Sequence, residues 1–311
     1  MAVTLPQAAL LSENDLQRGV IETFVQSSVI LDRIPLMDIE GNAYAYNEEA
    51  SLPGVAFRGV NEAYVESTGT VNQKSESLVI LGGDADVDRF IVKTRGNLND
   101  QRAVQTGMKV KAASYKFQDA FFNGDVAVEP KGFDGLKKRL VGGQVLDAAT
   151  NGLGPVTAGH DFFDALDALI ASVNGDVSAL YANKSVIGKI KSSARRLGGT
   201  DYFVDELTQK RTLTYNGIPL LDPGVNAAGA AILPQTETVG SSSTTSSIYA
   251  VKFGEDEGDQ GVTGLNNGGV QVEDLGQLQE KPAYRTRIEF YTGLAVFGGK
   301  AAARLRGVLA A

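Results

Sequence analysis

Few side chains in this sequence could do chemistry. Histidine occurs once, as His160, and cysteine is absent. A catalytic triad or a histidine metal cluster needs more than one subunit can build around a single imidazole, and thiolate chemistry and disulfides are excluded. We interpret His160 as a solvent-exposed residue at the start of a helix rather than as a catalytic group.

Two short motifs could in principle hold an ion. The densest acidic run, Glu255–Asp259, lacks the spacing and the terminal bidentate Glu of a calcium loop. The segment Gly298-Gly299-Lys300 lacks the upstream glycine of a phosphate loop, and Ala301 stands where Ser or Thr should ligate magnesium. We interpret the acidic run as a solvated loop, and we predict no catalytic, cofactor-binding or metal site. An unrecognised metal-dependent enzyme that uses Asp and Glu alone stays a minor alternative.

Composition limits the class of protein. With 311 residues the chain can bury a sizeable core, in one large domain or two intertwined ones. The net charge of −8 argues against a dedicated nucleic-acid binder but allows a local basic face. The longest apolar runs are far too short to span a membrane, and residues 1–11 lack the basic region of a signal peptide. We therefore expect a soluble protein made in a cytoplasm.

The first third of the sequence predicts extended parts that need a partner surface. Leu5–Ser28 has one apolar helical stripe, which cannot bury itself alone. Ile39–Val79 then alternates small, aromatic and acidic residues in short strands. Such a two-stranded excursion is marginal in isolation. Because its tyrosines lie among acids, we expect them to pack on a protein neighbour rather than on nucleic-acid bases.

A strand and a long helix follow. Asp86–Lys93 alternates as a strand, and Asn99–Phe122 has helical periodicity. We expect the helix to bury a stripe against this strand and against the later strand Arg287–Tyr291. Its expected members are Val104, Met108, Ala112 and Tyr115. A second helix is predicted over Phe133–Ala149, ending at a Gly/Pro-rich boundary over 151–155.

The pattern beyond residue 155 is α/β. A helix begins at His160, and a basic helix, Lys184–Arg196, follows the N-cap residue Asn183. The Ser/Thr-rich segment Gly240–Ser246 predicts an exposed loop. The predicted strands are Ser178–Tyr181, Thr212–Tyr215, Ile218–Leu221, Ser247–Phe253 and the closing strand Tyr284–Tyr291.

This order of parts resembles the major capsid proteins of tailed bacteriophages, whose Hong Kong 97-type fold is shared by encapsulins. Besides the layout, the resemblance rests on Ser178–Asn183 with its basic helix, on Thr214–Asp222, and on the closing strand with the Ala-rich tail after it. It implies an α+β fold in four parts. These are an N-terminal arm (1–38), an extension loop (39–80), a peripheral domain with a long spine helix (81–150 and 281–311) and an axial α/β domain (151–280).

The resemblance also implies a function. A major capsid subunit is a structural protein, not an enzyme, that self-assembles into hexamers and pentamers of an icosahedral phage head around double-stranded DNA, in the host cytoplasm. A portal and a separate scaffolding protein are expected partners, since no charged scaffolding segment precedes Leu5, and a decoration protein is an optional one. The alternative shell is an encapsulin-type bacterial compartment. Lys74 lies on the extension loop without an identifiable Asn partner, so no cross-link is predicted.

Two sets of residues are predicted to act in assembly. The subunit-interface set lies on the extension loop and comprises Tyr44, Tyr46, Phe57, Arg58 and Tyr64. The lumen-facing basic set lies on the arm and the spine helix and comprises Arg18, Lys109, Lys111 and Lys116. Contact of the second set with DNA is expected to be weak and without sequence preference, through phosphate alone.

Overall fold

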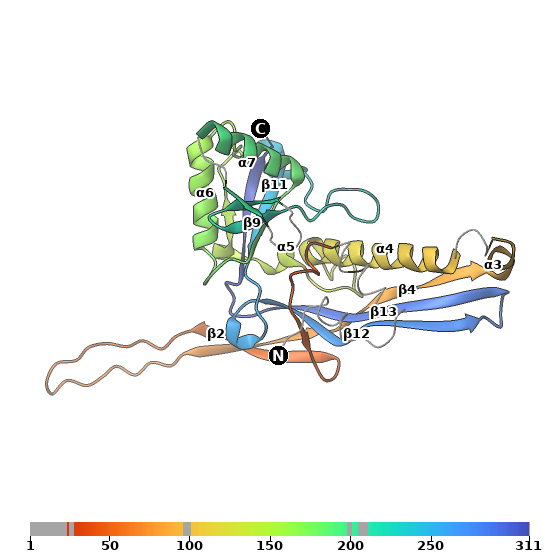
Figure 1. Cartoon of the computed structure of the whole chain (residues 1–311). Helices are drawn as coiled ribbons and strands as arrows, with labels where there is room; N and C mark the ends of the chain where they lie inside the picture. Colours follow the sequence, from red (N-terminus) through yellow and green to blue (C-terminus); the bar gives the residue numbers. More distant parts are fainter. Residues whose placement is uncertain (1–23, 25–27, 96–100, 198–200, 205–210, 311) are drawn as a thin grey trace.

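The computed structural model describes residues 24, 28–95, 101–197, 201–204 and 211–310. These residues form an α+β fold with two sheets and a projecting hairpin (Figure 1). The four-stranded peripheral sheet has the order β1 (Leu36–Asp38), β12 (Val262–Gln277), β13 (Ala283–Val296), β4 (Val79–Asp88). The axial sheet has the order β5 (Val145–Asp147), β14 (Ala302–Leu309), β11 (Ser242–Val251), β6 (Ala179–Tyr181), β9 (Ile218–Leu221), β8 (Arg211–Tyr215), β7 (Asp201–Val204), with β10 (Glu237–Val239) paired to β11.

The spine helix α4 (Gln101–Asn123) runs along the peripheral sheet, as Figure 1 shows. Its existence is confirmed, but the predicted buried stripe is wrong, because Met108 is 63% exposed and Val104 is also exposed. The face that packs is displaced around the helix, and Val110 on it is only 1% exposed. Its members are Thr106, Val110, Ser114, Phe117, Gln118, Phe121 and Phe122. The displacement follows from the three phenylalanines at the C-terminal end, whose large apolar areas decide which side is buried.

The C-terminal half of α4 lies between the two sheets. Phe117 packs on Phe290 of β13, with ring centroids 6.1 Å apart. Phe122 packs on Tyr181 of β6 at 5.4 Å and on Tyr249 of β11 at 5.1 Å. One apolar core therefore joins the peripheral sheet, α4 and one face of the axial sheet.

The predicted strand Asp86–Lys93 is wrong in its second half. β4 ends at Asp88, and Arg89–Arg95 form the short helix α3. The Asp88 carboxylate accepts a hydrogen bond from the backbone N–H of Phe90 at 2.7 Å, which caps the new helix and ends the strand.

The predicted helix Phe133–Ala149 is also wrong. Only Leu136–Arg139 are helical (α5), and a 3-10 turn at Gly142–Gln144 leads into β5. The helix ends at Leu140, whose backbone is extended, and Gly142 then takes a φ of +62°, a conformation that glycine adopts without strain. The parallel pairing of β5 with β14 then outweighs the helical periodicity of its residues.

Two helices cover the other face of the axial sheet. Phe162, Leu166 and Leu169 of α6 (Gly159–Ala171) share a core with Val186 and Ile190 of α7 (Lys184–Leu197). As predicted, the helix begins beside an exposed His160, and the side chain of Asn183 caps α7 by accepting from Ser185 N–H at 2.9 Å. The predicted loop Gly240–Ser246 is wrong, because β11 begins at Ser242 and its hydroxyls at Thr245 and Ser246 are buried.

The sheets also change the expected domain boundaries. β12 lies in the peripheral sheet between β1 and β13, although its residues fall inside the predicted axial segment. β14 lies in the axial sheet, although its residues fall inside the predicted peripheral segment. The chain thus crosses between the sheets at 252–261 and again at 297–301. Sequence order alone does not reveal such crossings, because both strands are apolar enough for either core.

Candidate subunit interface

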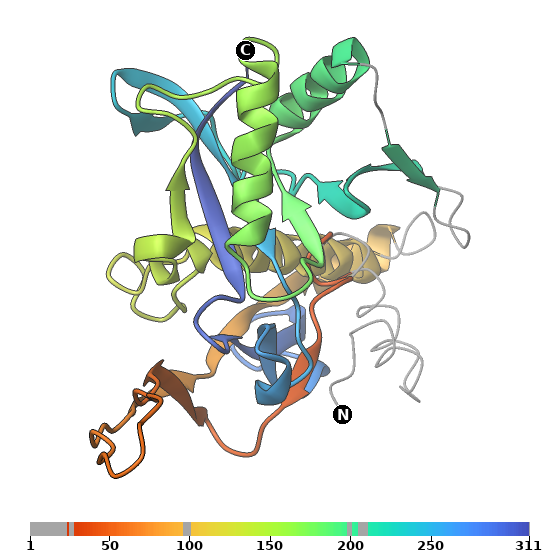
Figure 2. The same cartoon turned by 90° about the vertical axis from the view of Figure 1, so that its left-hand side faces the viewer.

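The extension loop is a long hairpin that projects from the rest of the chain (Figures 1 and 2). Its lower part pairs β2 (Ala43–Ser51) with β3 (Thr70–Ser77) in antiparallel register. Between these strands, residues 52–69 have no sheet partner among the described residues. They form an extended tip with only local contacts, such as Arg58 stacked over the Tyr64 ring at 5.2 Å.

The tip exposes apolar side chains to an unusual degree. Phe57 is fully exposed, and Leu52, Val55, Val60 and Val65 are nearly so. A contiguous exposed apolar surface on a soluble protein generally marks an interaction site. Phe57, Arg58 and Tyr64 of the predicted interface set therefore lie where a neighbouring molecule can reach them.

The root of the hairpin is anchored in its own subunit. Tyr46 is only 3% exposed, its ring meets Phe297 edge-on at 4.9 Å, and its hydroxyl donates to the Val296 carbonyl at 3.2 Å. Burial, together with the nearby Glu76 charge, raises the pKa of Tyr46 to about 12. The expectation that Tyr46 contacts another subunit is corrected, since it has no surface left to offer.

Tyr44 is half-buried, between the fully exposed Phe57 of the tip and the buried Tyr46 of the root. Its ring stacks on Tyr46 at 6.3 Å and meets Phe297 at 6.1 Å, while its hydroxyl donates to Glu257 at 3.3 Å. Partial burial, followed by the Glu257 charge, raises its pKa. No local sequence pattern predicts this root cluster, because Phe297 and Glu257 are more than 200 residues away from the tyrosines.

Ion pairs also fix the hairpin root. Lys74 of β3 pairs with Glu48 of β2 at 2.5 Å. Glu76 forms a bidentate pair with Arg139 of α5, one contact of which is 2.7 Å. The first pair therefore ties the two strands of the root to each other, and the second ties β3 to α5.

The predicted lumen-facing bases are not gathered into one patch. Lys109 and Lys116 are seven residues apart and share one flank of α4, whereas Lys111 lies on the opposite flank. Lys116 pairs with Glu129 at 2.6 Å, and Lys111 stands over the Tyr115 ring at 5.5 Å. Arg18 lies outside the described residues.

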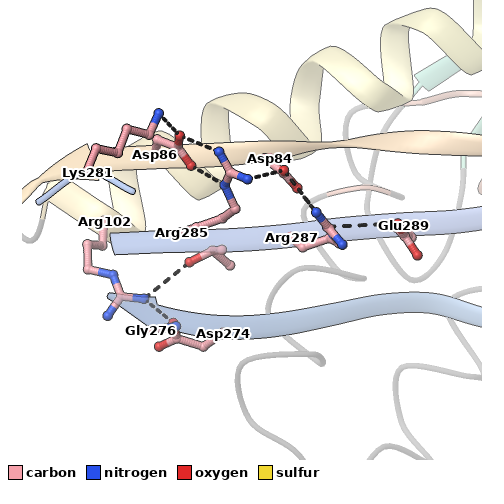
Figure 3. Close-up of polar contacts among 10 residues, drawn as sticks. Asp84, Asp86, Arg102, Asp274, Gly276, Lys281, Arg285, Arg287 and Glu289 are labelled. Carbon is pink, nitrogen blue, oxygen red and sulfur yellow. Dashed lines mark hydrogen bonds and ion pairs between the residues drawn. The ribbon is translucent and has the colours of Figure 1, made fainter. Parts of the chain in front are cut away.

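The face of the peripheral sheet away from α4 carries a ladder of ion pairs, drawn in Figure 3. Arg285 forms a bidentate pair with Asp86 across β13 and β4, at 2.7 and 2.8 Å. Arg287 does the same with Asp84, at 2.9 and 3.1 Å. Hydrogen bonds from these guanidinium groups hold the pKa of each carboxyl below its usual range, and Lys281 adds to this effect at Asp86.

The acidic run Glu255–Asp259 has a local role. The Asp256 carboxylate accepts from the N–H groups of Gly258 and Asp259, and Asp259 accepts from Glu255. Within the described ranges, no group of three or more His, Asp or Glu side chains is placed to hold a metal ion. Likewise, no helix of the described part is long and apolar enough to cross a membrane.

Comparisons with known proteins agree with the fold. Residues 12–157, slightly less than half of the chain, match the family model "Major capsid protein GP7". No curated protein matches the sequence.

Three solved structures illustrate the structural likeness. The SrpI encapsulin of Synechococcus elongatus PCC 7942 superposes with a TM-score of 0.67 at 18% identity, over 90% of this chain and 87% of that one. The capsid of the native GTA particle gives 0.64 at 12% identity, over 91% and 90%. Mycobacterium phage Bobi gives 0.57 at 14% identity, over 89% of each chain.

At these identities the structural neighbours establish the fold, and the family model adds a sequence relationship over the arm, the extension loop and the spine helix. The resemblance in fold that was predicted from the sequence is therefore confirmed. The chain has the Hong Kong 97-type fold of phage capsid and encapsulin subunits, and its residues 12–157 match the family model of a major capsid protein.

Proposed function

We propose that this protein is the major capsid subunit of a tailed bacteriophage, assembling through hexamers and pentamers into an icosahedral head around double-stranded DNA. The observation that carries the proposal is the extension loop, whose tip exposes apolar residues while its root is fixed in the subunit. A monomeric protein would leave this surface in water, whereas a shell buries it between subunits.

A second exposed apolar surface on the same chain supports self-assembly. Phe90 and Ile91 of α3 and Val104 and Met108 of α4 are exposed, although all four are apolar. The tip of the extension loop of one copy can therefore bind the exposed apolar surface on α3 and α4 of a neighbouring copy. Phe57, Arg58 and Tyr64 are the tip residues that we assign to this contact.

Contents and further partners follow from the same proposal. The flanks of α4 with Lys109, Lys111 and Lys116 are assigned to the lumen, together with Arg18 of the arm, where they make weak phosphate contacts. A separate scaffolding protein and a portal act during assembly in the host cytoplasm, and the finished particle admits a decoration protein. The capsid structure of satellite phage P4 includes a size-determination protein, which supports an external assembly factor here.

An encapsulin-type compartment is the second candidate. The specific observation that favours it is the TM-score of 0.67 with the SrpI encapsulin, against 0.64 for the native GTA particle capsid and 0.57 for Mycobacterium phage Bobi. The two shells differ in what they enclose, nucleic acid in one and cargo protein in the other.

Electron microscopy of the purified protein tests the shell, and nuclease-protected nucleic acid in the particles separates the two candidates. Phe57→Ala/Tyr64→Ala should leave a folded subunit that no longer forms particles, because aromatic anchors dominate interfaces. Val128→Ala, a truncation at another exposed site, is the matched control. The proposal would be contradicted by a wild-type protein that stays monomeric at high concentration, both alone and when co-expressed with the scaffolding protein and portal proposed above.

A further inference from the structure

The two helices on the axial sheet carry opposite charges. α6 contains Asp161, Asp164 and Asp167 and has no Lys or Arg. α7 has five Lys and Arg residues in fourteen positions and no Asp or Glu. The bases of α7 are Lys184, Lys189, Lys191, Arg195 and Arg196. Both helices pack on one sheet, yet each presents a single sign of charge to the outside.

These charges are exposed, and most of them have no partner in their own subunit. Within the part of the chain that the structure describes, no carboxylate forms an ion pair with Lys184, Lys189, Arg195 or Arg196. Asp167 is the exception on α6, since it accepts hydrogen bonds from Tyr215 at 2.7 Å and Asn216 at 3.3 Å. Asp161 and Asp164 are left facing solvent.

Helix stability does not explain the pattern on α7. Arg195 and Arg196 have the favourable sign for a helix C-terminus, but Lys184 in the first turn has the unfavourable one, and no acid accompanies it. Lys191 and Arg195 are four residues apart on the same side, where like charges repel. The arrangement weakens the isolated helix, so it indicates a partner of negative charge.

We propose that the basic face of α7 docks against Asp161 and Asp164 on α6 of the next copy of the chain around a capsomer. This inference rests on the proposed shell function and names the contact that closes the ring. In Figure 1, α6 runs along the left side of the axial domain and α7 across its top, and in Figure 2 α6 faces the viewer with α7 at the upper right. The two helices therefore lie at different edges of the axial domain, one along its side and one across its top.

That geometry suits a head-to-tail contact. Two different patches on one subunit, each complementary to the other, join copies head to tail into a ring rather than into a two-fold dimer. Opposite charges also steer the approach of subunits and disfavour pairing of like faces. The contact would therefore be strongest at low ionic strength and weaken as salt screens it.

Charge reversal tests the contact. The first variant, Lys184→Glu/Lys189→Glu/Arg195→Glu, makes α7 acidic, and the second, Asp161→Lys/Asp164→Lys, makes α6 basic. Each variant alone should lose at least tenfold in capsomer yield, measured by native mass spectrometry and microscopy, with a thermal midpoint of the subunit close to wild type. Both sets of changes in one chain should restore rings, because the complementarity is restored with its sign exchanged.

Mixing the two single variants gives a sharper readout. In the first variant α6 and α7 are both acidic, and in the second both are basic. Opposite charges therefore meet only where the two variants alternate around the ring. Even-membered rings should reappear in the mixture, whereas five-membered rings should stay absent, because an odd ring must contain one mismatched contact. The matched control is Lys131→Glu, which changes a charge on an exposed loop outside α6 and α7.

Three results would overturn the inference. Either single variant could form shells as well as wild type, or the combined chain could fail to recover although its subunit is folded. Alternatively, the α7 variant could form normal shells that hold less nucleic acid, which would assign α7 to DNA rather than to a second copy. Wild-type protein is measured in parallel. If the proposed shell function itself is wrong, the wild type will form no rings either, and this outcome is distinct from the three above.

Discussion

The axial and peripheral sheets place charge in opposite ways. The axial sheet is covered on both faces, and the pair that Arg304 of β14 forms with Glu237 is buried there at 2.8 Å, with Ser247 bonded to both side chains. The peripheral sheet is covered by α4 on one face only, and its other face carries the ladder of Asp84, Asp86, Arg285 and Arg287 in partial contact with water. Removing one partner of an ion pair is therefore expected to lower the free energy of unfolding strongly in the axial sheet and only slightly in the peripheral sheet.

The largest effect is expected under α4. Val110→Asp places an unpaired charge in the core between α4 and the peripheral sheet, and should lower the free energy of unfolding by about 4 kcal/mol. Met108→Asp, two residues earlier and 63% exposed, should change it by no more than about 0.5 kcal/mol. Urea denaturation of unassembled subunits measures both values. Equal losses for the two variants would show that α4 packs with a different face.

The buried ion pair comes next. Arg304→Met leaves the Glu237 carboxylate without its main partner in a covered site, and should cost about 3 kcal/mol. Arg306→Met, on the same strand but in an exposed pair with Asp147, is the control and should cost about 0.5 kcal/mol or less. If the order of the two losses were reversed, the contrast between covered and open faces would be wrong.

Smaller losses of stability are expected in the extension loop, where a buried and an exposed aromatic residue can be compared. Tyr46→Ala removes a ring packed on Phe297 and should destabilise the subunit by about 2 kcal/mol, less than a deep core truncation because the hairpin root can adjust. Phe57→Ala should leave subunit stability unchanged and act only on assembly. Thermal denaturation below the assembly concentration distinguishes them. Destabilisation by Phe57→Ala would place the tip inside the subunit.

The smallest effect concerns pH. The pKa values of Asp84 and Asp86 are lowered in the folded state, so their stabilisation is present above the unfolded value of about 3.9 and is lost as pH falls through the folded value. The thermal midpoint of wild type should therefore exceed that of Asp84→Asn/Asp86→Asn at pH 6, and the gap should narrow towards pH 3. Parallel curves for the two proteins would show that folding does not lower the pKa values of Asp84 and Asp86.

The sequence predicted the parts whose local pattern agrees with their final surroundings. The cap at Asn183, the helix after His160 and the closing strand were all confirmed, because capping and alternation are local properties. The buried stripe of α4 was wrong because distant partners, the rings of Phe290, Tyr181 and Tyr249, select the packed face.

Candidate-site predictions divided in the same way. Exposure of the tip around Phe57 followed from the character of the segment, which has too little apolar material to bury itself. Burial of Tyr46 did not follow, because the ring that covers it, Phe297, belongs to a crossing between sheets about 250 residues later. Such contacts arise from topology, which the local sequence does not encode.

The anchored root gives the extension loop the properties of a lever. An extended chain from Tyr46 to Phe57 spans about 36 Å, so a rotation of about 10° at the root would move the tip by about 6 Å. Gly298 and Gly299, with φ values of +73° and +67°, lie beside the pivot at Phe297. In the shell that we propose, a small adjustment at this root would be enough to fit the tip to neighbours at the different angles of five-fold and six-fold rings. The curvature of the shell would then be set at a joint of three aromatic rings.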